Sequence, residues 1–368
     1  MLLKDFGEKA QRKLSLSRVI VVGAGGLGCP VLQYLTAAGV GTIGLIDDDV
    51  VSLENLHRQV LYKTEDIGTP KVICAERTLK QLNPGISLQA FFSRLTNQNA
   101  LEILGTYDVV VDGTDNFASR YLINDACVLL NKPLVYGAIS QYEGQVAVFN
   151  YPENKKRSVN YRDLFPEPTG EGEVMNCEEI GVLGVLPGII GSMQANEAIK
   201  IITGIGKPLF NRLITYHSLN NHFYNLEIYP RKESKSRIPK TRLHFKNFDY
   251  NGFCSSDSSL INEVNISQLK DLLNRKDSGI LDIREHGEIR GVEKYQYVHI
   301  PYDRLKNKTH LIRGEKVVVI CDKGINSQRA VRQLVQLFGN QKRFYSLKGG
   351  MVAWNMYYEK SDYEKNKA

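Results

Sequence analysis

A glycine-rich loop between a predicted strand and a predicted helix constrains the fold of this chain more than any other feature. Arg18–Val22 is a short apolar run, residues 23–28 read Gly-Ala-Gly-Gly-Leu-Gly, and Pro30–Ala38 has apolar residues at helical spacing. Glycines in this position let the backbone approach a phosphate at the N-terminus of a helix. The order predicts a nucleotide site in an α/β domain, although GxGxxG alone does not distinguish NAD from ATP.

Further apolar runs alternate with helical patterns along the first two thirds of the chain. Thr42–Ile46, Val109–Val111 and Leu134–Tyr136 read as buried parallel strands, and Ser192–Thr203 reads as an amphipathic helix. Strands that alternate with helices in this way are typical of βαβ units. The sequence therefore predicts a Rossmann-like, doubly wound α/β domain over residues 1–230.

The last third of the 368 residues predicts a second, smaller α/β domain. Residues 231–257 include the polar run RKESKSRIPKTR and read as an interdomain linker. Residues 258–368 contain apolar strands at Gly279–Ile283 and Lys316–Cys321 and a helical pattern over Ser327–Phe338. About 100 residues is an ordinary size for an independent domain.

Charged side chains follow the strands at the edge where an α/β sheet binds its ligands. Asp47 ends the second strand, where a carboxylate can accept hydrogen bonds from ribose hydroxyls, and Arg58, Lys71 and Asp115 come after it. Adenylation of a carboxylate needs cations on the triphosphate and an acidic group for Mg²⁺. Because hydride transfer has no use for these groups, they favour ATP over NAD.

The first domain resembles the ubiquitin-activating-enzyme-like adenylyltransferases of the MoeB and ThiF type. The resemblance covers about residues 2–228 and rests on the motifs GAGGLG, DDDVVSLENLHRQ, GTPK, DGTDN, EGQVAVF and GVLGVLPGIIGSMQANEAIK. It implies that ATP and Mg²⁺ are used to adenylate the C-terminal glycine of a ubiquitin-like sulfur carrier protein of the MoaD or ThiS type. It also implies a homodimer, which the apolar helical pattern over Ile189–Ile202 supports.

The same resemblance identifies candidate site residues. Arg58, Lys71 and Asp115 are the candidate catalytic residues of adenylation, and Asp115 is also the candidate Mg²⁺ ligand. The candidate nucleotide-binding residues are Gly23, Gly25, Gly26, Gly28, Asp47, Glu54, Asn55, Leu56, His57, Arg58, Lys71, Asp115 and Asn116.

The sequence departs from the family's pattern in two places. The family commonly holds zinc through two CxxC pairs, but here the first position reads Asn-Tyr-Arg-Asp over residues 160–163 and the second, near residues 228–238, has no cysteine. We therefore expect no zinc site, because the thiolate ligands are missing. The family also commonly begins with an arginine-containing segment that reaches ATP across a dimer. The sequence starts at Met1 where that segment should already have passed, so we expect either an internal start or loss of that arginine.

Cys321 ends a predicted strand and opens the loop Cys-Asp-Lys-Gly-Ile-Asn-Ser before a helix. Backbone N–H groups of such a loop point at the sulfur and favour a thiolate or a persulfide. Residues 262–358 resemble a rhodanese domain, with further landmarks in LDIRE, HIP and GGMVAW. We expect Cys321 to carry a persulfide that converts the adenylated carrier to a thiocarboxylate. Asp322 stands where arginine is common, which favours a persulfide donor such as a cysteine desulfurase over thiosulfate.

Cys177 is the second candidate catalytic cysteine. In sulfur-transferring relatives a cysteine that matches this position can form a covalent link to the carrier. Its acidic neighbours Glu178 and Glu179 should raise its pKa, so a structural thiol remains the alternative. The cysteines that fall in apolar helical patterns and read as core residues are Cys29, Cys74 and Cys127.

Composition excludes other classes of protein. No apolar run reaches the roughly 20 residues that span a bilayer, and the first residues lack a signal-peptide core. Six cysteines without a CxxC pair indicate neither a disulfide framework nor a zinc clip and fit a cytoplasmic protein. Residues 1–228 carry 20 basic and 24 acidic side chains and residues 229–368 carry 27 and 16, but no aromatic-interleaved basic motif points to nucleic acid.

Two alternatives to a sulfur-carrier adenylyltransferase stay open at this point. One is a NAD-dependent oxidoreductase with an appended sulfurtransferase domain, and the other is a catalytically silent module that binds the carrier. The presence of Arg58, Lys71 and Asp115 together argues against both. The residues do not choose among carriers for molybdopterin, thiamin or tRNA thiolation.

Overall fold

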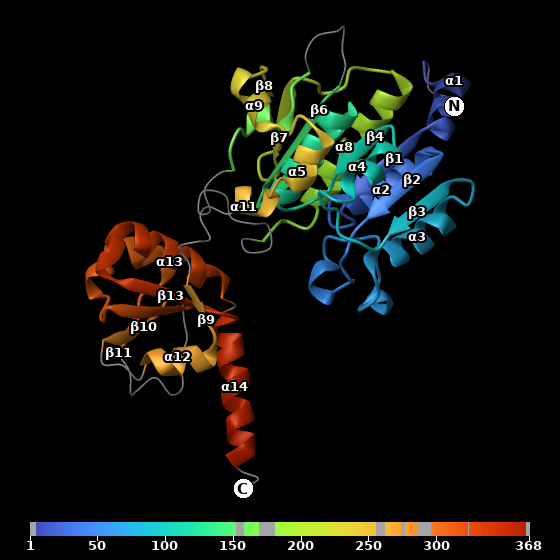
Figure 1. Cartoon of the computed structure of the whole chain (residues 1–368). Helices are drawn as coiled ribbons and strands as arrows, with labels where there is room; N and C mark the ends of the chain where they lie inside the picture. Colours follow the sequence, from blue (N-terminus) through green and yellow to red (C-terminus); the bar gives the residue numbers. More distant parts are fainter. Residues whose placement is uncertain are drawn as a thin grey trace. The chain divides into compact units, whose positions relative to one another are not determined.

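The computed structural model describes residues 5–151, 158–168, 181–254, 262–273, 277–285, 296–322 and 324–365. It divides into two compact units, Met1–Cys254 (unit 1) and Ser255–Ala368 (unit 2), each with a sheet of its own (Figure 1). An α/β unit followed by a smaller α/β unit is the fold class that the sequence predicts.

Unit 1 is built on an eight-stranded sheet with the strand order β3-β2-β1-β4-β5-β6-β7-β8. The strands are β1 (Arg18–Val22), β2 (Thr42–Ile46), β3 (Ser87–Phe91), β4 (Val109–Asp112), β5 (Leu134–Ser140), β6 (Glu143–Phe149), β7 (Arg212–His217) and β8 (His222–Glu227). Strands β1 to β5 are parallel, and β6 to β8 continue the sheet antiparallel. The order reverses between β1 and β4, and doubly wound sheets bind ligands at such a switch point.

Helices cover both faces of this sheet (Figure 1). They are α1 (Gly7–Leu16), α2 (Gly28–Ala38), α3 (Lys71–Leu82), α4 (Ala100–Gly105), α5 (Phe117–Leu130), α6 (Tyr161–Leu164), α8 (Leu186–Thr203), α9 (Lys232–Arg237), α10 (Arg242–Asn247) and α11 (Tyr250–Cys254). Val19 and Val21 of β1 share a core with α1, α2, α3 and α8, whereas Ile20 and Val22 share one with α4, α5, α10 and α11. Because successive side chains of a strand point to opposite faces and both faces are covered, β1 is apolar from Val19 to Val22.

Several predicted elements agree closely with the structure. The strands predicted over Arg18–Val22 and Thr42–Ile46 have those bounds, and β4 and β5 run past their predicted ends. Helix α8 begins at Leu186, earlier than predicted. Its residues Ala195 and Ala198 are buried in the core of unit 1, whereas Ile201 and Ile202 are only partly buried.

The prediction that residues 231–257 form an interdomain linker is corrected by the structure. The described part of this segment forms α9, α10 and α11 and belongs to unit 1. Phe245 and Tyr250 are buried in the core on the α5 face, and the Tyr250 hydroxyl donates a hydrogen bond to Asp125 at 3.0 Å. The segment is polar in composition, but a few of its aromatic side chains are buried and pack it against α5.

Unit 2 is a five-stranded parallel sheet in the order β11-β10-β12-β13-β9. Its elements are β9 (Asn262–Val264), α12 (Ile266–Leu273), β10 (Ser278–Asp282), β11 (Gln296–His299), β12 (Lys316–Ile320), α13 (Ile325–Phe338), β13 (Arg343–Leu347) and α14 (Gly350–Lys365). Val317 and Val319 of β12 face a core with α13, and Val318 and Ile320 face a core with α12 and α14. Cys321 directly follows β12.

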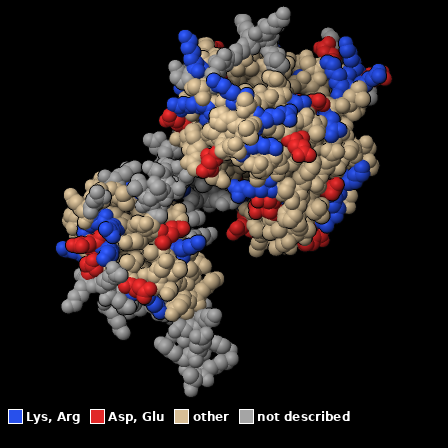
Figure 2. All heavy atoms as spheres, viewed as in Figure 1, with Lys and Arg blue, Asp and Glu red and all other residues tan. Residues whose placement is uncertain are grey.

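The described surface is mixed in charge. On the face of unit 1 seen in Figure 2, basic and acidic side chains are interspersed, as solvated surface charges are. Among the described residues, no helix combines the length and the hydropathy needed to cross a bilayer.

Candidate functional site

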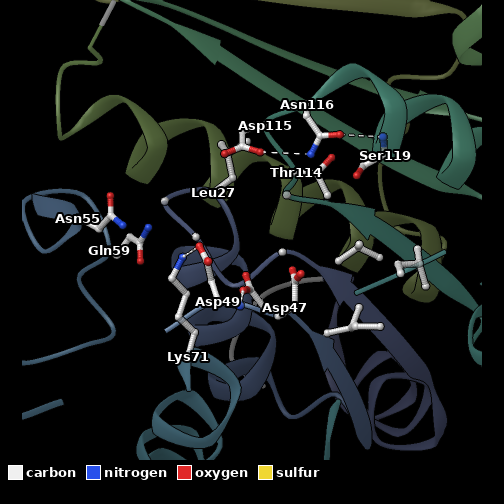
Figure 3. A pocket seen from close by; sticks show the side chains of 18 of the residues that line it. Leu27, Asp47, Asp49, Asn55, Gln59, Lys71, Thr114, Asp115, Asn116 and Ser119 are labelled. Carbon is white, nitrogen blue, oxygen red and sulfur yellow. Dashed lines mark hydrogen bonds and ion pairs between the residues drawn. The ribbon is translucent and has the colours of Figure 1, made fainter. Parts of the chain in front are cut away.

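A cavity of about 390 Å³ lies at the carboxyl ends of β1, β2 and β4 (Figure 3). The predicted nucleotide-binding residues that line it are Gly23, Gly25, Gly26, Asp47, Asn55, Arg58, Lys71, Asp115 and Asn116. The predicted residues that do not line it are Gly28, Glu54, Leu56 and His57. The structure thus brings together residues from four separate motifs at the switch point of the sheet.

Close backbone contact forms the floor of this cavity. A Cβ atom at Gly28 would lie 1.9 Å from the carbonyl oxygen of Gly23. Gly23 itself has a φ of +92°, and a Cβ there would lie 2.8 Å from the carbonyl oxygen of Gly113. These contacts require glycine, and they place Gly28 beneath the cavity rather than in its wall.

Asp47 is fixed against the glycine loop. One carboxylate oxygen accepts a hydrogen bond from the Ala24 N–H at 2.7 Å, and the other accepts one from the Asp49 N–H at 2.8 Å. Burial raises the pKa of Asp47, and the positive charge of Lys71 opposes that shift. The carboxylate therefore has one defined orientation from which it can accept hydrogen bonds from a ligand.

Lys71 is the first residue of α3 and forms an ion pair with Asp49, with 2.8 Å between Nζ and Oδ2. The Lys71 side chain is only 5% exposed, whereas that of Asp49 is 69% exposed. Figure 3 shows the pair at the wall of the cavity that α3 supplies. A nearly buried ammonium is thus held at the cavity by a carboxylate that water can reach.

Arg58 is held by the short segment that precedes it. Its Nη2 donates a hydrogen bond to the Asn55 side-chain oxygen at 2.6 Å, and its Nη1 donates one to the Glu54 carbonyl at 3.4 Å. Nη1 also lies 2.8 Å from Nε2 of His57. Glu54 and His57 therefore act on the orientation of Arg58 and do not line the cavity themselves.

Asp115 and Asn116 lie where α5 begins. The Asn116 side chain caps this helix by accepting a hydrogen bond from the Ser119 N–H at 2.9 Å, and its amide lies 3.4 Å from an Asp115 oxygen (Figure 3). Beneath them, Asp112 accepts hydrogen bonds from the N–H and the hydroxyl of Thr114, at 2.9 and 2.7 Å. Burial raises the pKa of Asp112. The hydrogen bonds of Asp112 and Asn116 thus stabilise the turn that carries Asp115.

The cavity also contains residues that the sequence motifs do not predict. Ser119 and Arg120 line it from α5. They come about one helical turn after Asp115 and Asn116, so projecting the helix from the DGTDN motif would have found them. Arg94 lies in the loop after β3, belongs to no motif and carried no signal in the sequence.

In unit 2 the loop after β12 surrounds the sulfur of Cys321. Sγ accepts hydrogen bonds from the N–H groups of Gly324 and Ser327, at 3.1 and 3.2 Å. The thiol lies 3.4 Å from the Ser327 hydroxyl, which is itself 2.9 Å from the hydroxyl of Ser346. Two N–H donors aimed at one sulfur stabilise negative charge on it, as the sequence predicts.

Charged groups lie beside this loop. Arg284 forms an ion pair with the fully buried Asp282 at 2.9 Å, and its Nη1 lies 4.0 Å from Asp322. The Asp322 side chain is exposed. The rim of the loop therefore carries an exposed carboxylate beside the guanidinium of Arg284.

The remaining described cysteines are buried or half-buried. Cys177 lies outside the described residues. Burial raises the pKa of Cys29 to about 12 and that of the half-buried Cys254 also to about 12. Cys29, Cys74 and Cys127 are buried, as predicted for core residues. Buried thiols that stay protonated are poor nucleophiles.

The position at which the family commonly has its first zinc ligands is joined to α9 by hydrogen bonds. Asn160 and Asp163 cap α6 reciprocally. Asp163 also accepts a hydrogen bond from the Arg231 N–H at 2.7 Å, and the Ser234 hydroxyl donates one to the Arg162 carbonyl at 3.1 Å. These contacts tie the segment 158–168 to the segment 231–254.

Arg162 is fully buried at the centre of this joint. Its guanidinium donates hydrogen bonds to both oxygens of Asp125, at 2.9 and 2.7 Å, and lies 4.8 Å from the ring centroids of Tyr121 and Phe253. Among the described residues, no group of three or more His, Cys, Asp or Glu could hold a metal ion. A permanent cation without thiolates nearby does not fit zinc.

Comparison with known proteins matches both units. Residues 1–238 match the ThiF family, and residues 265–357 match the rhodanese-like domain. A Thermus thermophilus protein named sulfur carrier protein adenylyltransferase is 51% identical over 257 residues, which cover 69% of this chain and 94% of the relative. Xenopus laevis MOCS3, named adenylyltransferase and sulfurtransferase, is 37% identical over 96% of this chain and 84% of its own length.

Mycobacterium tuberculosis MoeZ, named a probable adenylyltransferase/sulfurtransferase, is 38% identical over 96% of this chain and 91% of its own length. Among solved structures, Escherichia coli MccB crystallised with ATP matches with a TM-score of 0.53 at 22% identity. That match covers 61% of this chain and 67% of the MccB chain, and it shows a shared fold.

The glycine contact at the cavity floor gives a stability prediction. Gly28→Ala should lower the free energy of unfolding by about 1–3 kcal/mol, because the new methyl group would meet the Gly23 carbonyl. Gly188→Ala in α8 is the matched control, since its Cβ meets nothing within 4 Å, and it should raise stability by about 0.5–1 kcal/mol. Denaturant unfolding of the full chain measures both, and wild-type stability in Gly28→Ala would contradict a close approach of Gly28 to Gly23.

Proposed function

The chain belongs to the ThiF family, and from that membership we propose that unit 1 uses ATP to adenylate the C-terminal carboxylate of a ubiquitin-like sulfur carrier protein. The observation that carries the proposal is the grouping of Arg58, Lys71 and Asp115 around one cavity. Two cations suit a triphosphate and an acid suits a divalent ion, whereas hydride transfer uses neither. The relatives are named adenylyltransferases, so the oxidoreductase and the silent binding module lose their support.

In the proposed reaction, a carboxylate oxygen of the carrier's terminal glycine attacks the α-phosphorus of ATP. The bond from that phosphorus to the oxygen bridging to the β-phosphate breaks, and pyrophosphate leaves with the electron pair. Arg58 and Lys71 would bind phosphate oxygens, and Asp47 would accept hydrogen bonds from the ribose hydroxyls. Mg²⁺, held by Asp115 together with the phosphates, would supply charge stabilisation for the leaving pyrophosphate.

Lys71 must exchange its partner when ATP binds. Its ammonium lies 2.8 Å from Asp49, and this carboxylate is well exposed to water. A triphosphate offers several anionic oxygens, so Lys71 would move from Asp49 to the nucleotide, and Asp49 would be solvated in return. Asp49 in this proposal keeps the ammonium at the cavity while the nucleotide is absent.

We propose that Cys321 of unit 2 then supplies the sulfur. The terminal sulfur of a Cys321 persulfide attacks the acyl carbon of the adenylate and displaces AMP, which leaves an acyl disulfide between carrier and Cys321. A thiol then attacks Sγ of Cys321, releases the carrier thiocarboxylate and leaves a mixed disulfide that a second thiol reduces. The two N–H donors on Sγ support this role, and Cys177 is the candidate for an additional covalent link to the carrier.

The exposed carboxylate of Asp322 bears on the sulfur donor. A dianion such as thiosulfate would be repelled by the carboxylate at the rim of the loop, so we propose that the donor is a protein persulfide of the cysteine desulfurase type.

The family resemblance further supports a homodimer. Free thiols at the described cysteines fit the reducing environment of the cytoplasm.

Asp115→Ala should abolish carrier-dependent exchange of pyrophosphate into ATP, because Mg²⁺ loses its protein carboxylate while the fold is kept. Glu102→Ala, which removes an exposed acid from α4, is the matched control and should exchange at the wild-type rate. The assay uses a MoaD-type carrier, with the same carrier lacking its last glycine as the blank. Undiminished exchange in Asp115→Ala would remove Asp115 from the site.

Cys321→Ser should leave pyrophosphate exchange intact and stop formation of the carrier thiocarboxylate, which the mass of the carrier reports. Cys254→Ala is the control, because burial raises the pKa of this thiol to about 12 and it should be dispensable for both steps. Cys177→Ser should reduce thiocarboxylate formation only in part. Thiocarboxylate formed at the wild-type rate by Cys321→Ser would mean that unit 2 does not relay the sulfur.

The purified protein should contain no stoichiometric zinc, and a chelator should leave its unfolding transition unchanged. About one zinc per chain in elemental analysis would contradict the expectation that this protein lacks a zinc site.

Arg162→Met should lower the free energy of unfolding by about 3–5 kcal/mol, because the Asp125 carboxylate stays buried without the Arg162 guanidinium. Arg237→Met is the matched control, since its pair with Glu167 is partly exposed and should contribute about 0–1 kcal/mol.

A further inference from the structure

Arg120 in α5 stands between two cavities. It lines the cavity that contains the glycine loop, and it also lines a second cavity of about 140 Å³. The described lining of the second cavity includes aromatic residues, among them Phe117, Tyr136 and Tyr161, and also polar ones, among them Glu143 and Gln145. Among the described residues, Arg120 and Ile139 are the ones that line both cavities. Of the two, only Arg120 is charged.

The guanidinium of Arg120 is held in place by its surroundings. It is 8% exposed, its Nη2 donates a hydrogen bond to the Thr114 carbonyl at 3.4 Å, and its central carbon lies 5.5 and 5.8 Å from the ring centroids of Phe117 and Tyr136. Its charge also opposes the rise that burial causes in the pKa of Asp112. The guanidinium is therefore held in one place at the boundary of the two cavities.

We propose that Arg120 receives the substrate carboxylate and positions it for attack on the α-phosphorus. This inference rests on the proposed function. The nucleotide cavity has its own cations in Arg58 and Lys71, whereas Arg120 faces the space on the other side as well. A planar guanidinium matches a carboxylate with two parallel hydrogen bonds.

The chemistry needs such a group. The reaction joins two anions, since a carboxylate oxygen must bond to a phosphorus that carries negative oxygens, and no proton is transferred in that step. Arg120 lowers the repulsion between them without being consumed, and the electron pair of the broken bond leaves with pyrophosphate. A cavity of about 140 Å³ is small enough to suit the slim backbone of a glycine-ended tail.

The test separates binding of ATP from use of the carrier. In Arg120→Gln we expect the Kd for Mg-ATP without carrier to stay within about threefold of wild type, while carrier-dependent pyrophosphate exchange falls about 10²-fold. Arg120→Lys should recover part of the rate, because the charge returns without the planar fork. Arg212→Gln, which removes an exposed cation of β7 that lines neither cavity, is the matched control and should exchange within about threefold of wild type.

A second variant tests the route of the carboxylate independently. Ala138 lines the second cavity and not the first, so Ala138→Leu should fill it and raise the KM for the MoaD-type carrier about tenfold without changing the Kd for Mg-ATP. This variant also carries the test if circular dichroism finds Arg120→Gln unfolded.

The outcomes are distinguishable. If the wild-type chain shows no carrier-dependent exchange, the proposed function itself fails, whatever the variants do. If the wild type exchanges and Arg120→Gln matches it, the role of Arg120 is overturned. Equal losses of ATP binding and of exchange in Arg120→Gln would also overturn it, because Arg120 would then be a nucleotide ligand. An unchanged KM for the carrier in Ala138→Leu would exclude the second cavity as the route.

Discussion

The contact between the ends of β1 and β4 and the start of α2 is the constraint on which the site depends. Three glycines meet there: a side chain at Gly28 would overlap the Gly23 carbonyl, and one at Gly23 would press on the Gly113 carbonyl. Because the chains approach this closely, the loops that carry Asp47 and Asp115 face one cavity. The parallel pairing of β1 with β2 and β4 brings these loops to the same edge, and the glycine contact keeps them close.

Three of the charged side chains at the cavity are held by hydrogen bonds or an ion pair to nearby residues while no ligand is bound. Asn55 holds Arg58, Asp49 holds Lys71, and the Ala24 N–H holds Asp47. Such preorganisation lowers the entropy lost on binding, because the side chains are already in place. Glu54 and His57 belong to the DDDVVSLENLHRQ motif without lining the cavity, because they contact the guanidinium of Arg58.

Much of the fold and of the site could be predicted because short apolar runs and glycine loops act locally. β1 and β2 have their predicted bounds, and the motif residues meet at the predicted sheet edge. The sequence did not predict that residues 231–254 belong to the first unit. Their packing depends on a few aromatic side chains that contact core residues from much earlier in the sequence. Arg120 lies one helical turn after the DGTDN motif, so helical spacing could have placed it at the cavity, but its contact with a second cavity depends on tertiary packing.

The joint around Arg162 and Asp125 has a consequence for oxidation chemistry. A zinc clip made of thiolates is open to attack by persulfides and disulfides, the reagents that a sulfur-relay protein handles in every cycle. The described contacts of this joint between the segments 158–168 and 231–254 are made instead by nitrogen, oxygen and aromatic carbon atoms. The neighbouring thiol of Cys254 stays protonated at neutral pH because burial raises its pKa to about 12. The described contacts of this joint therefore offer such reagents no thiolate to attack.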